Sequence, residues 1–240
     1  MDERKNVLNR KNKQKEPVCE NLSFAAKEAF KRLRTNVDMS LQQENNKSDC
    51  RIIGVTSAQL GDGKSIVALN LAYSFAELGR RVLLIDADMR RPSIDKKLGL
   101  ALSPGLSNLL HDTNSVSAAI QKYRAGRGKT ELDIIPGGSI PQNPAELLSS
   151  KRMTRLLEVL ASAYDVLVLD LPPVGIVIDA VPAAQQADGM IIVVRENACP
   201  RAALKASVEQ LKYAGINILG FVVNGALEGS GKKYIYGKYY

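Results

Sequence analysis

The sequence has little of the cysteine and histidine chemistry on which many enzymes and secreted proteins depend. Its three cysteines, Cys19, Cys50 and Cys199, are odd in number, widely spaced and form no CxxC pair. Neither a disulfide framework nor a zinc site is therefore indicated, and this cysteine usage favours the cytosol. His111 is the only histidine and lies beside Asp112 in a polar stretch. We expect it to be exposed, which argues against a Ser-His-Asp or Cys-His catalytic centre.

Long hydrophobic runs are also missing. No uncharged apolar run reaches the length of a membrane span, and the opening MDERKNVLNRKNKQKE carries charge where a signal peptide has an apolar core. We therefore expect a protein that is neither secreted nor integral to a membrane. The first fifteen residues hold six Lys or Arg against two acids, which predicts a solvated, disordered arm over residues 1–20.

The net charge does not lead to a nucleic-acid partner. A formal charge of +8 would suit nucleic acid or an anionic membrane surface. The basic residues, however, are spread along the chain in pairs such as Arg80-Arg81 and Lys151-Arg152, so no nucleic-acid binding is expected. With 240 residues, 45% of them hydrophobic, the chain can form one domain around one substantial core.

Short apolar runs alternate with helical patterns over most of the chain. Apolar residues at helical spacing from Leu22 to Leu41 predict an amphipathic helix before the main domain. Strands are expected at residues 51–56, 81–86, 166–170, 190–194 and 217–224, with a further one at 132–136, and helices are expected from Ser65, Ala145, Ala180 and Ala202. This alternation of fully apolar runs with helices predicts a doubly wound α/β domain, with a mainly parallel sheet covered on both faces. The polar stretch over residues 103–131 is expected to form loops and short helices at one edge.

The loop SAQLGDGKS lies between an apolar strand and a helical pattern, which is the context that a phosphate-binding P-loop requires. Gly61 and Gly63 allow backbone amides to turn toward one anion, Lys64 can reach the β- and γ-phosphates, and Ser65 can ligate Mg²⁺. Ala58 stands where the usual pattern has its first glycine, a small change that should keep the amide cradle but constrain its first turn. A nucleoside triphosphate is the expected ligand, held by Ser57, Ala58, Gln59, Leu60, Gly61, Asp62, Gly63, Lys64 and Ser65.

Carboxylates follow two more of the expected strands. One strand leads to Asp86 and Asp88, another to Asp170, and in this fold strand ends face the ligand crevice. Asp170 suits a direct or outer contact to Mg²⁺. Asp86 and Asp88 point the same way if their strand continues and diverge if it turns. A turn or loop acid without function is the alternative for each of these positions.

Asn224 ends the last expected strand, at the same edge. Its amide could read an adenine base through its donor and acceptor together. It could equally be only a turn residue before Gly225, and the sequence leaves both interpretations open.

Half of the tyrosines lie at the end of the chain. Four of eight occur in the last seven positions, namely Tyr234, Tyr236, Tyr239 and Tyr240. The glycines and lysines around them argue against a packed strand and predict a flexible, accessible tail over residues 229–240.

Taken together, SAQLGDGKS, LLIDADMRRP and LVLDLPPV, followed by a terminal tyrosine cluster, resemble the bacterial tyrosine kinases of capsule and exopolysaccharide assembly. The likeness begins at about Ala26 and includes EAFKRLRTN and IPGGSIPQNPAELLSS. It implies a P-loop kinase domain over residues 21–228 with ATP and Mg²⁺ as cofactors. Lys64 and Ser65 would then serve the Walker A role, Asp86 and Asp88 the second Walker role, and Asp170 the Walker B role.

The resemblance also implies how this site would work. Asp86 is the best candidate for accepting the phenolic proton, while Ser65, Asp88 and Asp170 would hold the metal. The tail tyrosines would be autophosphorylation sites, modified in the pocket of a neighbouring subunit within a ring. Implied partners are a homo-oligomer, a separate membrane-spanning activator of the polysaccharide co-polymerase type, a cognate tyrosine phosphatase and other protein substrates. The kinase would be cytoplasmic and recruited to the inner face of the plasma membrane through the activator.

Glu28, Lys31 and Arg34 match the family's ExxRxxR subunit-contact motif. Lys31 replaces the middle arginine and loses its bidentate fork, which would weaken subunit contacts. A solvated helix face, with Glu28 paired to Lys31 or Arg32, is the alternative. Two other departures are Leu171, where the family has Ser or Thr after the Walker B aspartate, and Gln142, which interrupts a proline pair.

A Min- or partition-type positioning ATPase is the leading rival interpretation. Such proteins share the fold and the strand-end acids, but they carry a lysine early in the loop, where this chain has Gln59, and need no tyrosine tail. A role like that of the nitrogenase iron protein lacks suitably placed cysteines. No DFG or HRD signature of eukaryotic kinases occurs in the sequence.

Overall fold

The computed structural model describes residues 18–42, 49–111, 115–124, 130–177 and 180–225. The tyrosine tail and residues 1–17 of the expected arm lie outside these residues. Residues 18–20, the last part of that arm, are folded: Val18 is buried beside the 3₁₀ helix η1, Cys19–Asn21. The Cys19 backbone N–H donates to Asn70 Oδ1 at 2.6 Å.

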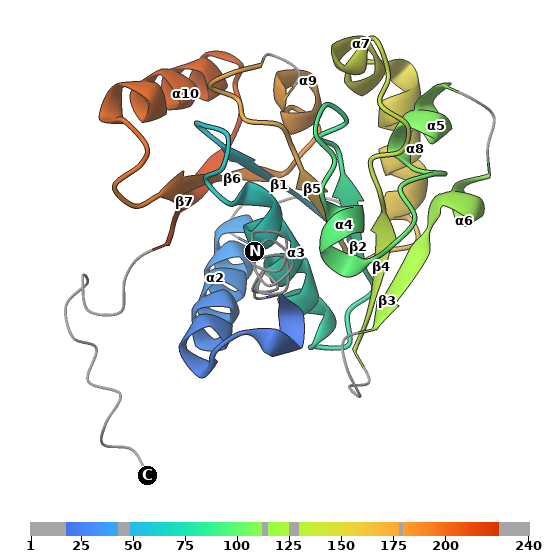
Figure 1. Ribbon diagram of the computed structural model, residues 1–240, viewed down its shortest axis with the longest axis horizontal. Helices are drawn as coiled ribbons and strands as arrows, with labels where there is room; N and C mark the ends of the chain where they lie inside the picture. The colour runs from blue at the N-terminus through green and yellow to red at the C-terminus, as the bar shows by residue number, and fades with distance from the viewer. Residues whose placement is uncertain (1–17, 43–48, 112–114, 125–129, 178–179, 226–240) are drawn as a thin grey trace, which may run out of the picture.

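A seven-stranded sheet forms the middle layer, in the order β3-β4-β2-β5-β1-β6-β7 (Figure 1). Its strands are β1 Arg51–Ser57, β2 Val82–Asp86, β3 Gln121–Arg124, β4 Glu131–Ile135, β5 Val166–Asp170, β6 Gly189–Arg195 and β7 Ile218–Asn224. All neighbours run parallel except β3 with β4. The predicted doubly wound, mainly parallel sheet is therefore confirmed.

Strand β3 was not predicted. It lies inside the stretch expected to hold only loops and short helices, and its residues alternate between half-buried and exposed. Polar pairs across the edge hold it, including Arg124 Nε donating to Glu131 Oε2 at 2.7 Å and an ion pair between Lys122 and Glu131. Such a polar edge strand has no apolar run by which the sequence could reveal it.

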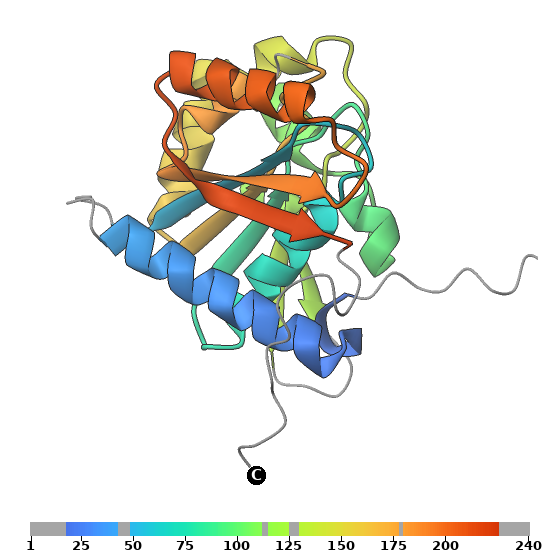
Figure 2. The same cartoon turned by 90° about the vertical axis from the view of Figure 1, so that its left-hand side faces the viewer.

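Helices cover both faces of the sheet (Figures 1 and 2). One face carries α2 Phe24–Gln42, α3 Lys64–Ala76 and α4 Ile94–Leu98. The other carries α5 Leu106–His111, α6 Val116–Ala119, α7 Pro144–Leu148, α8 Lys151–Ala161, α9 Ala180–Ala184 and α10 Arg201–Tyr213. The helix predicted from Ala145 is divided in two, because Ser150 starts α8 as its N-cap, with Oγ accepting from Met153 N at 3.3 Å.

The central and edge strands differ sharply in burial. Every residue of β2 and β5 is buried, as expected for strands covered on both faces. The edge strand β7 instead alternates between half-buried and exposed residues over its second half. Within the described part of the chain, no helix is both long and apolar enough to cross a membrane.

Candidate nucleotide-binding and catalytic site

The predicted P-loop connects β1 directly to α3. Gly61 and Gly63 have φ of 84° and 94°, in the left-handed region that glycine adopts without strain. The Asp62 carboxylate closes the turn by accepting the Gln59 N–H at 3.1 Å. Helix α3 begins at Lys64, directly after Gly63. The loop thus leads into a helix N-terminus whose first amides have no partner within the helix, as anion binding requires.

Ala58 does not distort this loop. It is buried at 1% exposure and is not among the described non-glycine residues with positive φ, so a side chain is accepted there without backbone strain. The backbone of Ala58 is instead approached closely by Gly175: a Cβ added to Gly175 would lie 2.3 Å from the Ala58 carbonyl oxygen.

Lys64 meets the acids of two neighbouring strands at the centre of the site. Its Nζ lies 2.9 Å from Asp88 Oδ2 and 3.0 Å from Asp170 Oδ1, and it donates to Ser65 Oγ at 3.2 Å. All four residues are buried. Burial alone would lower the pKa of Lys64, but the carboxylates of Asp170 and Asp88 outweigh it and hold that pKa above its usual range. Lys64 is therefore charged at neutral pH.

Asp86 and Asp88 diverge, which answers the question that the sequence left open. Strand β2 ends at Asp86, and after the turn Asp88 faces Lys64. Asp86 turns the other way, and its Oδ2 accepts the backbone N–H groups of Ser93 and Ile94 at 2.9 and 3.1 Å. Its Oδ1 accepts the N–H of Asp88 at 3.2 Å. Burial, supported by the Asp170 carboxylate, raises the pKa of Asp86 to about 7.

The donor set suits a magnesium ion. Asp170 is 0% exposed, and its Oδ2 is buried without a hydrogen-bond partner among the described residues. Burial raises its pKa although Lys64 opposes the shift. Carboxylates at this density around one lysine leave negative charge that a divalent cation would neutralise.

Few protein side chains are placed to hold that ion. No group of three or more His, Cys, Asp or Glu side chains placed to hold a metal occurs in the described part of the chain. This agrees with the habit of Mg²⁺, which takes one or two carboxylates together with phosphate and water oxygens. Asp170 Oδ2 and the Ser65 hydroxyl fit such a partial protein site.

Asn224 contacts the P-loop itself, which the sequence did not indicate. Its Nδ2 donates to the Asp62 carbonyl oxygen at 2.9 Å, and a Cβ added to Gly63 would lie 2.0 Å from the same nitrogen. Arg195, at the end of β6, donates from NH1 to the Gly61 carbonyl oxygen at 3.4 Å. Both contacts join residues more than 130 positions apart, so no local pattern could reveal them.

The motif on α2 lies away from this centre. Lys31 Nζ pairs with Glu28 Oε1 at 2.7 Å on the helix surface, which is the pairing that the alternative interpretation predicted. Arg34 donates instead to the carbonyl oxygen of Ser74 in α3. Leu171 is fully buried in the apolar cluster on the α8 face, so its position contributes packing and no hydroxyl. The four tail tyrosines lie outside the described residues.

Known proteins share this architecture. Residues 50–214 match the model of the AAA domain family. Tyrosine-protein kinase YwqD of Bacillus subtilis (strain 168) is 36% identical over 198 residues, covering 82% of this chain and 80% of that protein. Tyrosine-protein kinase Etk of Escherichia coli (strain K12) is 31% identical over 219 residues, which are 91% of this chain but 29% of Etk.

Solved structures of a tyrosine kinase domain and of a cell-division ATPase have a similar fold. The kinase domain of Escherichia coli ETK superposes with a TM-score of 0.78 at 29% identity, covering 96% of this chain and 90% of that domain. The septum site-determining protein MinD of Pyrococcus horikoshii OT3, complexed with Mg-ADP, gives a TM-score of 0.58 at 26% identity, covering 72% of this chain and 70% of MinD. The region matched by the AAA model contains the P-loop and both acid-bearing strand ends, and the chain belongs to the bacterial tyrosine kinases.

Proposed function

We propose that this chain transfers the γ-phosphate of ATP to tyrosine hydroxyls, above all those of its own terminal cluster, Tyr234, Tyr236, Tyr239 and Tyr240. The observation that carries the proposal is the meeting of Lys64, Asp88 and Asp170 beside the P-loop. Asp88 and Asp170 lie at the ends of the neighbouring strands β2 and β5, and Lys64 is the first residue of α3. Together they supply a phosphate-neutralising cation and oxygen ligands at one point.

ATP and Mg²⁺ are the cofactors of this site. The amides of residues 57–65 would hold the phosphates, and Lys64 would neutralise their charge. Ser65, Asp88 and Asp170 would hold the magnesium ion, which when bound supplies further positive charge to the phosphates. Phosphoryl transfer has a loose transition state, so this chain contributes mainly by positioning the reactants and neutralising charge.

Asp86 is proposed to accept the phenolic proton. A phenol has a pKa of about 10, and the raised pKa of Asp86 makes this carboxylate a better base than an exposed one. Asp86 is 0% exposed, and the turn from Asp88 to Ser93 donates hydrogen bonds to both its oxygens. The proposal therefore requires this turn to move aside when a tyrosine enters.

The tail can reach an active site. Ten residues separate Asn224 from Tyr234 and sixteen separate it from Tyr240, which correspond to about 30 to 50 Å of extended chain. A tail of that length can reach the active site of its own chain or that of a neighbouring subunit. The family resemblance favours modification in trans within a ring, with Glu28 and Lys31 on the exposed face of α2 as subunit contacts. Arg34 contributes less, since it already bonds to Ser74 of its own chain.

The wider setting follows from the family. We propose that the kinase regulates capsule or exopolysaccharide synthesis and export at the inner face of the plasma membrane. A separate membrane-spanning protein of the polysaccharide co-polymerase type would recruit and activate it, and a tyrosine phosphatase would reverse the modification.

Incubation of the purified chain with ATP, Mg²⁺ and the activator's cytoplasmic segment tests the kinase proposal. Mass spectrometry should find phosphotyrosine in the tail of the wild type and none in Lys64→Met. Lys205→Met is the matched control, because Lys205 lies on the surface of α10 with its side chain 78% exposed. Equal phosphorylation in Lys64→Met and the wild type would reject the P-loop assignment.

A positioning ATPase without kinase activity is the second candidate, favoured by the structural likeness to MinD. The two functions differ in the fate of the phosphate. A variant with all four tail tyrosines changed to Phe should lose autophosphorylation if the chain is a kinase. ATP turnover by the wild type with no phosphotyrosine on any protein would favour the positioning ATPase.

A further inference from the structure

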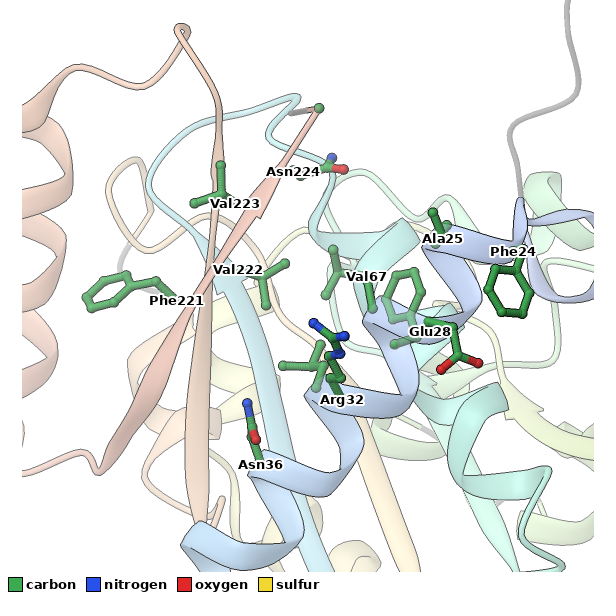
Figure 3. Close-up of a pocket in the computed structure, with 15 residues that line it drawn as sticks. Phe24, Ala25, Glu28, Arg32, Asn36, Val67, Phe221, Val222, Val223 and Asn224 are labelled. Carbon is green, nitrogen blue, oxygen red and sulfur yellow. The ribbon is translucent and has the colours of Figure 1, made fainter. Parts of the chain in front are cut away.

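A groove of about 620 Å³ lies between α2 and the edge strand β7. Figure 3 shows Val67 and Val222 beside this space and Arg32 reaching from α2 toward β7. At one end the groove is lined by Asn224, whose side chain also bonds to the P-loop at Asp62.

Three of the apolar residues that line the groove are exposed within the described part of the chain, although Phe221 points to the side of β7 away from α2 (Figure 3). Phe24 is 73% exposed, Phe221 52% and Val223 60%. Strand β7 also ends the sheet, so its outer edge presents backbone N–H and C=O groups without strand partners. An apolar groove beside an open strand edge suits an extended segment that adds to the sheet and places side chains in the groove.

The position at which the described chain stops indicates the occupant. It stops at Gly225, which itself lines the groove. Gly225 has φ of 75°, and an Asn-Gly pair after a strand favours a reversal of the chain. The residues that follow, 226–240, include Tyr234, Ile235 and Tyr236 in succession, all three with high strand propensity.

The length of chain also fits. From Phe24 to Asn36 the groove follows thirteen residues of α2, about 18 Å of helix. Residues 226–233 can span about 26 Å when extended, so they can bring the following residues to any point along it. A tether this short gives an effective concentration in the millimolar range, which favours the chain's own tail over a free partner.

We propose that Tyr234-Ile235-Tyr236 of the unmodified tail dock in the α2/β7 groove of the same chain, extended along the edge of β7. In an extended segment Ile235 faces one way and both tyrosines the other. Docking does not depend on the proposed kinase activity. If that activity is correct, phosphate on Tyr234 or Tyr236 would bring charge to an apolar groove beside Glu28 and release the tail.

Hydrogen exchange of the full chain, freed of phosphate and without ATP, tests the docking. The amides of residues 234–236 should exchange about tenfold more slowly than in an unstructured peptide. Ala29→Arg places a large side chain in the groove from an exposed position and should abolish that protection. Thr35→Arg is the control, because Thr35 is exposed on the same helix and does not line the groove.

Variants of the tail test the docking independently. Ile235→Asp should remove the protection, whereas Ser230→Asp, which adds the same charge in the linker, should leave it. Thermal melting of each variant checks that the domain remains folded. Tail amides that exchange at the unstructured rate in the wild type would overturn the proposal. So would β7 protection that rises with protein concentration while the tail stays unprotected, since a second copy would then cover the groove.

Discussion

Replacing Asn224 with Ala separates two roles for this residue, reading the adenine base and holding the P-loop. The side chain donates to the Asp62 carbonyl oxygen at 2.9 Å, and Asp62 is 2% exposed. Leaving such an acceptor without its donor costs about 1–3 kcal/mol. If the lost bond destabilises the nucleotide-binding conformation of the P-loop by that free energy, nucleotide affinity drops by about 5- to 150-fold.

The base of the nucleotide distinguishes the two roles. If Asn224 acts by holding the loop, Asn224→Ala weakens the binding of ATP, GTP and UTP by the same factor, as measured by calorimetry with Mg²⁺. Asn217→Ala is the matched control, since Asn217 makes the same kind of bond, Nδ2 to the Asp188 carbonyl oxygen at 3.0 Å, just before the other end of β7. That variant should lose stability but not affinity. A loss confined to ATP would refute the loop-holding argument and assign Asn224 to the base.

Three further predictions concern stability and reactivity. Lys64→Met removes the partner of two buried carboxylates and should lower the free energy of unfolding, measured by urea titration, by about 3–5 kcal/mol. An unchanged unfolding midpoint and slope would contradict the ion-pair geometry. Burial raises the pKa of Cys19 to about 12 and of Cys50 to about 11, so iodoacetamide at pH 8 should label the more exposed Cys199 first and the other two only on unfolding, as mass spectrometry would report. Ser150→Ala removes the cap of α8 and should cost about 1 kcal/mol, or about 2–4 °C in thermal melting; no change in melting temperature would exclude a stabilising cap.

The sequence predicted those parts of the molecule that depend on neighbouring residues. The P-loop is a continuous strand, turn and helix, so its residue types and spacing identify it before any fold is known. The buried strands are apolar throughout because helices cover both faces, and this gives them a clear signal. The position of Asp88 and Asp170 at the ligand crevice followed from the rule that parallel strands end at one edge of a sheet, whereas their ion pairs with Lys64 were not predicted.

Other features depend on contacts that no local pattern contains. The turn after β2 separates Asp86 from Asp88, and three backbone N–H groups determine where Asp86 points. The bond from Asn224 to Asp62 forms only when β7 is brought beside the P-loop. Strand β3 is held by polar pairs at an edge, where burial imposes no pattern. The subunit contacts on α2 and the roles of the tail tyrosines remain predictions.

The most direct test of the account is a quantitative phosphopeptide measurement on residues 226–240 after incubation with ATP, Mg²⁺ and the activator segment. We expect phosphate on tail tyrosines of the wild type, increasing with time and lost in both Lys64→Met and Asp170→Asn. A tail that stays unmodified while ATP is bound and hydrolysed, or one that is modified equally in both variants, would contradict it.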